Sequence, residues 1–308
     1  MERGMNKVVL VTRKTRLSEL IYKYNTIEQA RFYIEHMGAD FTDYLREDVN
    51  YREAVAEVVR TAEKYARVQQ IDREFLPNMI FGEKDIVIVV GQDGLIANVM
   101  KYLNGQPLIG VNPDPLRWDG VLLPFEPGQV EQILLKTIGG NHAVRQVTMA
   151  QASTQDGQTM LAVNDLFIGQ KTHVSARYDI MWNRRTEHQS SSGVIISTGL
   201  GSTGWYKSII TQAAGIAREF VNQDFRDGRR RWDDDELIFV VREPFPSRST
   251  QAEIVYGRLG RADSFKILSK MPGNGVVFSD GIESDAIEFN SGTEVTIEIA
   301  PKKGVLVV

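Results

Sequence analysis

The chain of 308 residues contains no cysteine, which excludes disulfides, zinc–thiolate sites and thiol catalysis. Its 4 histidines show no metal-ligand spacing, so the sequence predicts no metal site built from protein side chains alone. No apolar run is long enough to span a bilayer, and the N-terminal stretch lacks the apolar segment of a signal peptide. These absences favour a cytoplasmic protein that does not contact a membrane.

The charge balance argues against another class of partner. The net charge is -4 and the isoelectric point is near 5.7, whereas a nucleic-acid-binding protein usually carries a basic surface. Hydrophobic residues make up 42% of the chain, which is enough to bury a sizeable core. A length of 308 residues favours two domains. The sequence therefore predicts a two-domain globular protein that acts on small molecules rather than on nucleic acid.

Residues 1–130 alternate between strand and helix patterns, which is typical of a doubly wound α/β domain with a parallel sheet. The apolar runs predict strands at Val8–Thr12, Ile86–Val90 and Pro107–Val111. Helices are expected at Thr26–Met37, Asn50–Gln70 and Leu95–Leu103. Two pairs have capping-box spacing, namely Thr26 with Gln29 and Asn50 with Glu53. In this fold, ligands bind at the carboxyl ends of the strands.

One such strand end carries the segment Gly-Gln-Asp-Gly at 91–94. Gly91 and Gly94 allow a sharp reversal and a close backbone approach, and the N–H groups that open the next helix would face an anion. Asp93 is unexpected there, because a carboxylate beside a phosphate is repelled unless it serves a cation or a proton transfer. The alternative is that Asp93 only caps a helix that starts near Leu95. The turn alone leaves both interpretations open.

Residues 131–308 change to mostly short strand patterns separated by turn residues, which predicts a β-rich second domain. A return of the last strand to the first domain is compatible with this pattern. One helix is expected after Gly204. Strands are expected at Arg145–Ala152, Met160–Ile168, His173–Met181, Val194–Ser197, Leu237–Val241, Phe265–Leu268, Glu294–Ile299 and Val305–Val308.

The helix after Gly204 follows a glycine-rich segment in which Gly199, Gly201 and Gly204 fit the dinucleotide-binding pattern G-x-G-x-x-G. No βαβ continuation follows it, so the Rossmann interpretation is weak. The Walker A pattern fails because Trp205 stands where a lysine is required. What remains is a backbone nest with the hydroxyls of Ser202 and Thr203, which suits a polar or anionic ligand.

Four motifs together resemble the NAD kinase family in order and spacing: GQDG at 91–94, VND at 163–165, SSGVIISTGLGSTGWY at 191–206 and SDG at 279–281. Three further segments are similar to the mitochondrial branch of that family: IGVNPDP at 109–115, SSG at 191–193 and REPFPSR at 242–248. The resemblance extends over nearly the whole chain. It implies an α/β domain followed by a β-rich domain, and the phosphorylation of the adenosine-ribose 2′-hydroxyl of NAD by ATP with Mg²⁺.

The resemblance also implies roles for individual residues. Asp93 corresponds to the general base that takes the proton of the ribose hydroxyl. The residues implied in phosphate binding are Gly91, Gln92, Gly94 and Asn112. The residues implied in NAD binding are Asn164, Asp165, Ser202, Thr203, Gly204, Trp205 and Ser208. Members of the family form homodimers or homotetramers, so we expect at least a homodimer.

The sequence departs from the family pattern at the turn. Gln92 replaces a glycine and Leu95 replaces a threonine, while Asp114 stands near a position where the family has glycine. Asp165 is one methylene shorter than the usual glutamate. These departures bear on ATP binding more than on dinucleotide binding. Two alternatives therefore stay open: a kinase of another hydroxylated substrate such as a lipid or a sugar, and a catalytically impaired nucleotide-binding homologue.

For two residues, Asn112 and Asp280, the sequence leaves both a structural and a ligand-binding interpretation open. Asn112 follows the predicted strand that ends at Val111, and its amide suits either a ligand or the turn before Pro113. Asp280, followed by Gly281, is typical of a hairpin turn, whereas the resemblance suggests a position facing the dinucleotide.

Overall fold

The computed structural model describes residues 7–221 and 230–308. The chain forms two compact units, Met1–Arg145 with Val305–Val308, and Gln146–Gly304. The sequence placed the boundary near residue 130, but helix α5 (Val130–Ile138) buries Val130, Ile133 and Leu134 in the core of the first unit. Unit 1 therefore extends beyond the predicted boundary and also contains the last residues of the chain.

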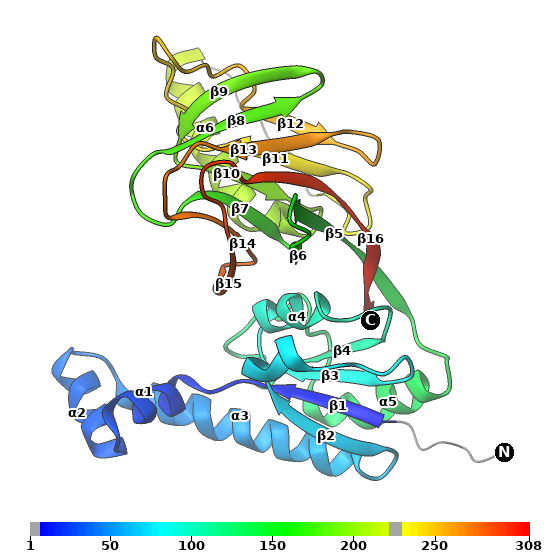
Figure 1. Cartoon of the computed structure of the whole chain (residues 1–308). Coiled ribbons are helices and arrows are strands. Elements are labelled where there is room, and N and C mark those ends of the chain that lie inside the picture. The colour runs from blue at the N-terminus through cyan, green and yellow to red at the C-terminus, as the bar shows by residue number, and fades with distance from the viewer. Residues whose placement is uncertain (1–6, 222–229) are drawn as a thin grey trace. The chain divides into compact units, whose positions relative to one another are not determined.

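Unit 1 contains a parallel sheet in the strand order β2, β1, β3, β4 (Figure 1). The strands are β1 (Lys7–Thr12), β2 (Arg67–Asp72), β3 (Ile86–Val90) and β4 (Leu108–Val111). The end of β16 (Glu294–Val307) continues this sheet, because Leu306 pairs with Leu108 in parallel. Every residue of β3 and β4 is buried, as expected for a parallel sheet covered on both faces.

Some helices of unit 1 pack on its sheet, and others form a small separate cluster. They are α1 (Arg16–Tyr24), α2 (Ile27–His36), α3 (Phe41–Ala62), α4 (Asp93–Met100) and α5, with the 3₁₀ turns η1 (Arg73–Asn78) and η2 (Pro127–Gln129). The apolar side chains of α3 and α5 pack on those of β1 and β3. Helices α1 and α2 form a separate small core with the start of α3 (Figure 1).

The helix-capping predictions had mixed outcomes. Thr26 does cap α2, since its hydroxyl accepts the N–H of Gln29 at 3.1 Å. The predicted start at Asn50 is wrong, because α3 begins at Phe41 and its cap is Asp40. The predicted helix up to Gln70 is also wrong at its end, where strand β2 forms instead. The mostly polar side chains of β2 gave no strand signal in the sequence. The strand forms because parallel pairing with β1 provides partners for the hydrogen-bonding groups of its backbone.

Unit 2 is built from antiparallel strands in two sheets. One continues from β16 through β13 and β8 to β9, with β5 on β16 and β6 on β5; the other has the order β12, β11, β10, β7, β14, β15. The strands are β5 (Val144–Thr154), β6 (Thr159–Ala162), β7 (Asp165–Gln170), β8 (Ala176–Trp182), β9 (Arg185–Ser191), β10 (Val194–Ser197), β11 (Leu237–Val241), β12 (Tyr256–Leu259), β13 (Phe265–Ser269), β14 (Gly275–Ser279) and β15 (Ile282–Glu288).

The two sheets of unit 2 share an apolar core that contains the fully buried rings of Tyr178, Phe239 and Phe265. Helix α6 (Trp205–Val221), preceded by the 3₁₀ turn η3 (Gly201–Thr203), packs on the other face of the six-stranded sheet, where Tyr206 contacts Ile238. The strand predicted over Met160–Ile168 is in fact two strands. Chain residues 163–164 break it, and these belong to one of the four sequence motifs.

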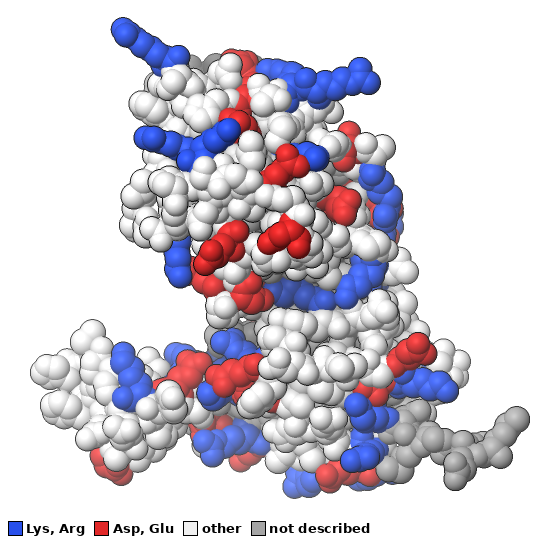
Figure 2. All heavy atoms as spheres, in the orientation of Figure 1, with Lys and Arg blue, Asp and Glu red and all other residues white. Residues whose placement is uncertain are grey.

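The surface carries charged side chains of both signs, in line with the small net charge of the chain. Figure 2 shows basic and acidic side chains interspersed over the visible face of each unit. Within residues 7–221 and 230–308, no helix has both the length and the apolar character needed to cross a membrane.

Candidate functional site

The turn after β3 has the geometry of a strand-to-helix loop. Strand β3 ends at Val90 and α4 begins at Asp93, with Gln92 as the N-cap residue and no side-chain capping bond. The interpretation of Asp93 as the cap of a helix near Leu95 is therefore wrong, because Asp93 is itself the first helical residue. Gln92 has a φ of −124°, so its backbone does not require the glycine of the family pattern.

The carboxylate of Asp93 is held by the loop that follows β4. Its Oδ1 accepts the backbone N–H of Leu122 at 2.8 Å, and its Oδ2 accepts that of Val121 at 3.2 Å. The side chain is half-buried. Each carboxylate oxygen has a second lone pair, so an oriented Asp93 can still accept a hydrogen bond from a hydroxyl.

The two glycines of the turn differ in their surroundings. A Cβ on Gly91 would lie 2.8 Å from Cδ2 of Leu95, whose side chain is only 4% exposed. Gly94 is exposed, and a Cβ there would meet nothing within 4 Å. Leu95 thus closes one side of the turn with apolar atoms, while the backbone at Gly94 is open to a ligand.

Asn112 is used inside its own loop. Its Nδ2 donates to the carbonyl of Trp118 at 2.9 Å, and its Oδ1 accepts the N–H of Asp114 at 3.1 Å. The residue is 5% exposed. Asp114 in turn accepts a hydrogen bond from Asn50 of α3 at 3.2 Å. The amide of Asn112 therefore closes the turn around Pro113, as one of its two interpretations proposed.

In unit 2, the turn at Asp280 organises the VND motif. The carboxylate of Asp280 accepts the backbone N–H groups of Val163 at 3.1 Å, Asn164 at 2.7 Å and Asp165 at 3.3 Å. Asp280 and Gly281 have φ values of 54° and 72°, as a tight β14–β15 hairpin requires. Asp280 is therefore both a hairpin residue and the acceptor that shapes a segment more than a hundred residues earlier in the chain.

The glycine-rich loop packs on the same segment. The N–H of Thr198 donates to the carbonyl of Asn164 at 3.0 Å, and the hydroxyl of Thr198 donates to that of Val163 at 2.6 Å. A Cβ on Gly201 would lie 1.9 Å from the carbonyl oxygen of Asn164. Close packing of two backbones thus explains this glycine without a Rossmann site. Three motifs that are far apart in the sequence meet here.

The residues predicted to bind NAD surround this junction with different degrees of exposure. Thr203, Gly204 and Ser208 are exposed, and Asn164 is half-buried. Ser202 is 8% exposed and its hydroxyl donates to the carbonyl of Gly199 at 2.7 Å, so it supports the loop. The exposed members are the ones available to a ligand.

Trp205, also predicted to bind NAD, is half-buried in an aromatic group. Its indole stacks on Phe167 with 5.7 Å between ring centroids, and the Arg242 guanidinium lies 5.2 Å from its centroid. Phe167 carried no recognisable sequence signal, since its role depends on the pairing of β7 with β10. Arg242 opens the REPFPSR segment at 242–248, which the sequence marked only as part of the resemblance and not as a neighbour of Trp205.

Asp165 lies at the centre of the junction and is 7% exposed. Burial raises the pKa of its carboxyl to about 7, and the nearby charge of Asp280 adds to the increase. At neutral pH the carboxyl is therefore divided between its neutral and ionised forms. A neutral carboxyl can donate a hydrogen bond as well as accept one.

The donor set does not form a metal site by itself. Among the described residues, no group of three His, Asp or Glu side chains could hold a metal ion. Asp93 is a lone carboxylate at its turn. Mg²⁺ commonly binds through one or two carboxylates together with the phosphates of a substrate, so the residues fit a Mg²⁺ that arrives with a triphosphate.

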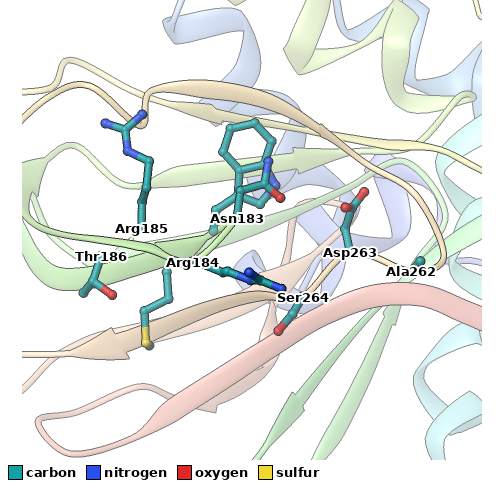
Figure 3. A pocket seen from close by; sticks show the side chains of 9 residues that line it. Asn183, Arg184, Arg185, Thr186, Ala262, Asp263 and Ser264 are labelled. Atoms are coloured by element: carbon teal, nitrogen blue, oxygen red, sulfur yellow. The ribbon is translucent and has the colours of Figure 1, made fainter.

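A hollow of about 550 Å³ lies elsewhere in unit 2, at the tip of the β8–β9 hairpin (Figure 3). Its lining includes Asn183, Arg184, Arg185 and Asp263, and contains none of the predicted site residues. It is therefore separate from the junction described above.

The relatives found by sequence comparison are NAD kinases. No family model matches the chain. The NAD kinase of Legionella pneumophila strain Corby is 31% identical over 140 residues, which cover 42% of this chain and 46% of that protein. The NAD kinase of Cupriavidus pinatubonensis is 29% identical over 136 residues, which cover 40% and 42% of the two chains. The chain thus matches less than half the length of these relatives.

Solved structures match over nearly the whole chain. An NAD kinase from Archaeoglobus fulgidus in complex with ATP has a TM-score of 0.60 at 16% identity, covering 98% of this chain and 93% of that one. Yeast NADH kinase complexed with NADH has a TM-score of 0.59 at 13% identity, covering 99% and 84%. The predicted fold class, an α/β domain followed by a β-rich domain, is confirmed.

Proposed function

We propose that this chain, whose partial sequence matches and fold support the predicted resemblance to the NAD kinase family, phosphorylates the adenosine-ribose 2′-hydroxyl of NAD with ATP. The observation that carries this proposal is the junction in unit 2, where Asp280, the VND motif and the Thr198–Gly204 loop are bonded together. A lipid kinase needs an apolar tunnel, whereas the exposed groups at this junction are polar.

Unit 2 contributes the recognition of the dinucleotide. The half-buried amide of Asn164 offers a donor and an acceptor that suit a ribose diol. Thr203, Gly204 and Ser208 present exposed hydroxyl and backbone groups, and the indole of Trp205 offers an apolar face. Together these groups bind NAD and orient its ribose.

Unit 1 contributes the acid–base residue. The ribose oxygen attacks the γ-phosphorus of ATP, a new O–P bond forms, and the bond from the γ-phosphorus to the bridging oxygen breaks so that ADP leaves. Asp93 accepts the proton of the hydroxyl. The N–H groups of Val121 and Leu122 fix its orientation in advance, which favours a reaction that depends mainly on positioning.

Magnesium fits this scheme as a ligand of the phosphates. When bound, it neutralises charge on the triphosphate and on the leaving ADP. Asp93 is the carboxylate of the turn that could also contact it, and Gly94 leaves backbone space for the phosphates.

A direct assay tests the proposal. Purified protein is incubated with NAD and Mg-ATP, and NADP is measured with an NADP-specific dehydrogenase. The proposal predicts NADP formation that requires both substrates. The absence of NADP at high protein concentration would exclude it.

A second candidate, a nucleotide-binding homologue without transferase activity, is favoured by one observation. The side chain of Leu95 packs against Gly91 where the family has a threonine hydroxyl. Calorimetry distinguishes the two, because NAD binding without any detectable binding of Mg-ATP would support the second candidate.

A further inference from the structure

The loop after β4 orients the carboxylate of Asp93, through the N–H groups of Val121 and Leu122. Close packing holds the inner end of this loop. A Cβ on Gly110 of β4 would lie 2.2 Å from the carbonyl oxygen of Leu122, and Leu122 is 3% exposed. Val121, by contrast, is 50% exposed. The packing that fixes Leu122 therefore does not extend to its neighbour.

The outer part of the same loop is tied to helix α3 by Arg117. Its guanidinium makes a bidentate contact with the carboxylate of Asp43, in which Nη1 donates to Oδ2 at 3.0 Å and Nη2 donates to Oδ1. The side chain of Arg117 is only 20% exposed. A planar guanidinium that meets a carboxylate through two parallel bonds fixes direction as well as distance. This ion pair therefore holds the loop in one orientation on α3.

Asp43 is well suited to hold this contact. It lies in the first turn of α3, where the helix dipole favours negative charge. Hydrogen bonds from Arg117 and Arg16 keep the pKa of its carboxyl well below the usual range, so it is ionised at neutral pH. A second contact joins the loop to the same helix, because the amide of Asn50 donates to Asp114 at 3.2 Å.

Helix α3 also holds the strand that leads into Asp93. The hydroxyl of Tyr51 donates to the carbonyl of Val90, the last residue of β3, at 3.1 Å. Tyr51 lies two helical turns after Asp43 and directly follows Asn50, so the three residues share one side of α3. One side of the helix therefore contacts both the strand that precedes Asp93 and the loop that orients its carboxylate.

We propose that Arg117 is a positioning residue for the phosphoryl transfer, because its ion pair with Asp43 fixes the loop whose N–H groups orient the Asp93 carboxylate. This inference rests on the proposed function for the identity of the reaction. Arg117 touches neither substrate in this scheme and acts only through the backbone of the loop. A misplacement of a catalytic group by about 1 Å can cost roughly 100-fold in rate, so a contact away from the reacting atoms can control turnover.

Arg117→Ala tests the inference, because it removes the contact and leaves Asp93 in place. We expect the kcat of NADP formation to fall by about 10-fold or more, while the KM for NAD stays within about 2-fold because the groups proposed to bind NAD lie in unit 2. Arg117→Lys keeps the charge without the bidentate geometry, so it should recover only part of the loss. A kcat of Arg117→Ala within about 2-fold of the unmodified value would overturn the proposal.

Arg16→Ala is the matched control. Arg16 donates to the same carboxylate, with 2.8 Å between its Nη2 and Oδ2 of Asp43, but it lies on α1 and its ion pairs among the described residues all go to α3. Both variants lose an ion pair to Asp43, so we expect similar melting temperatures. The kcat of Arg16→Ala should stay within about 2-fold of the unmodified value. An equal loss of kcat in the two variants would place the effect in the fold of α3 and overturn the proposal.

Hydrogen exchange tests the same inference without turnover. In the ligand-free protein, Arg117→Ala should speed exchange of the Val121 amide hydrogen by about 10-fold or more, and Arg16→Ala should not. If the unmodified protein forms no NADP while exchange changes in this way, the proposed function fails and the control of the loop by Arg117 stands. Unchanged exchange in Arg117→Ala would overturn the inference whether or not NADP is formed.

Discussion

The carboxylate of Asp280 lies 2.7 Å from the backbone nitrogen of Asn164, although the two residues are separated by 116 positions in the sequence. The same carboxylate also accepts the N–H groups of Val163 and Asp165. A hairpin at the end of β14 thus determines the backbone geometry of the segment that we propose binds NAD.

Replacing Asp280 removes this support. Asp280→Ala leaves three backbone N–H groups without their charged acceptor, so we expect a loss of about 2–4 kcal/mol in unfolding free energy and a KM for NAD raised at least about 10-fold. Thermal unfolding and NAD kinetics measure the two effects. Glu288→Ala, an exposed acid on the adjacent strand β15, should change neither. Equal behaviour of the two variants would contradict the role given to Asp280.

The raised pKa of Asp165 predicts a pH-dependent stability. Its pKa in the folded protein, about 7, lies above the ordinary aspartate value of 3.8, so the stabilising contribution of the protonated carboxyl is complete below pH 3.8 and is lost as the pH rises to 7. Asp165→Asn removes the titration. Its stability relative to the unmodified protein should increase from pH 4 to pH 7 by up to roughly 4 kcal/mol, and then level off. A difference that does not vary with pH would show that Asp165 is ionised throughout.

The close packing at Gly201 predicts a contrast between two glycines. Gly201→Ala would place a Cβ 1.9 Å from the carbonyl oxygen of Asn164, so the loop must move and we expect the loss of both stability and NAD binding. Gly215→Ala on α6 meets nothing within 4 Å and should stabilise the protein by about 0.5–1 kcal/mol. Similar melting temperatures for the two variants would contradict the packing described.

Leu95 gives a prediction about the altered turn. Leu95→Thr restores the hydroxyl of the family pattern, so we expect a higher kcat/KM for ATP together with about 1–3 kcal/mol of lost stability from the smaller apolar contact on Gly91. Leu95→Val shortens the side chain without adding a hydroxyl. If both variants change ATP kinetics equally, the hydroxyl has no role and only the packing matters.

The buried parallel strands could be predicted from the sequence, and the four motifs could be recognised in it, because both have local signatures. Ile86–Val90 is a continuous β-branched run, and Thr26 has a local capping partner. It could not predict β2 or β9, whose polar residues form strands only because neighbouring strands satisfy their backbones. The start of α3 was also missed, since Asn50 and Glu53 imitate a cap inside a continuing helix.

The candidate site shows the same division. Asp93, Asn164 and the glycine-rich loop could be recognised from the sequence, whereas their supports could not. The bonds from Asp280 to VND and from Leu122 to Asp93 join segments that only the fold brings together.

The proposed phosphoryl transfer depends most on Asp93, and the comparison of Asp93→Asn with the unmodified protein tests it most directly. NAD affinity from calorimetry and the rate of NADP formation are measured on the same samples, with thermal unfolding to confirm that both are folded. We expect an NAD affinity within about 3-fold of the unmodified protein and a turnover lower by about 100-fold or more, because the base is lost while the NAD-binding groups of unit 2 remain. A folded Asp93→Asn protein that forms NADP at the unmodified rate would contradict it.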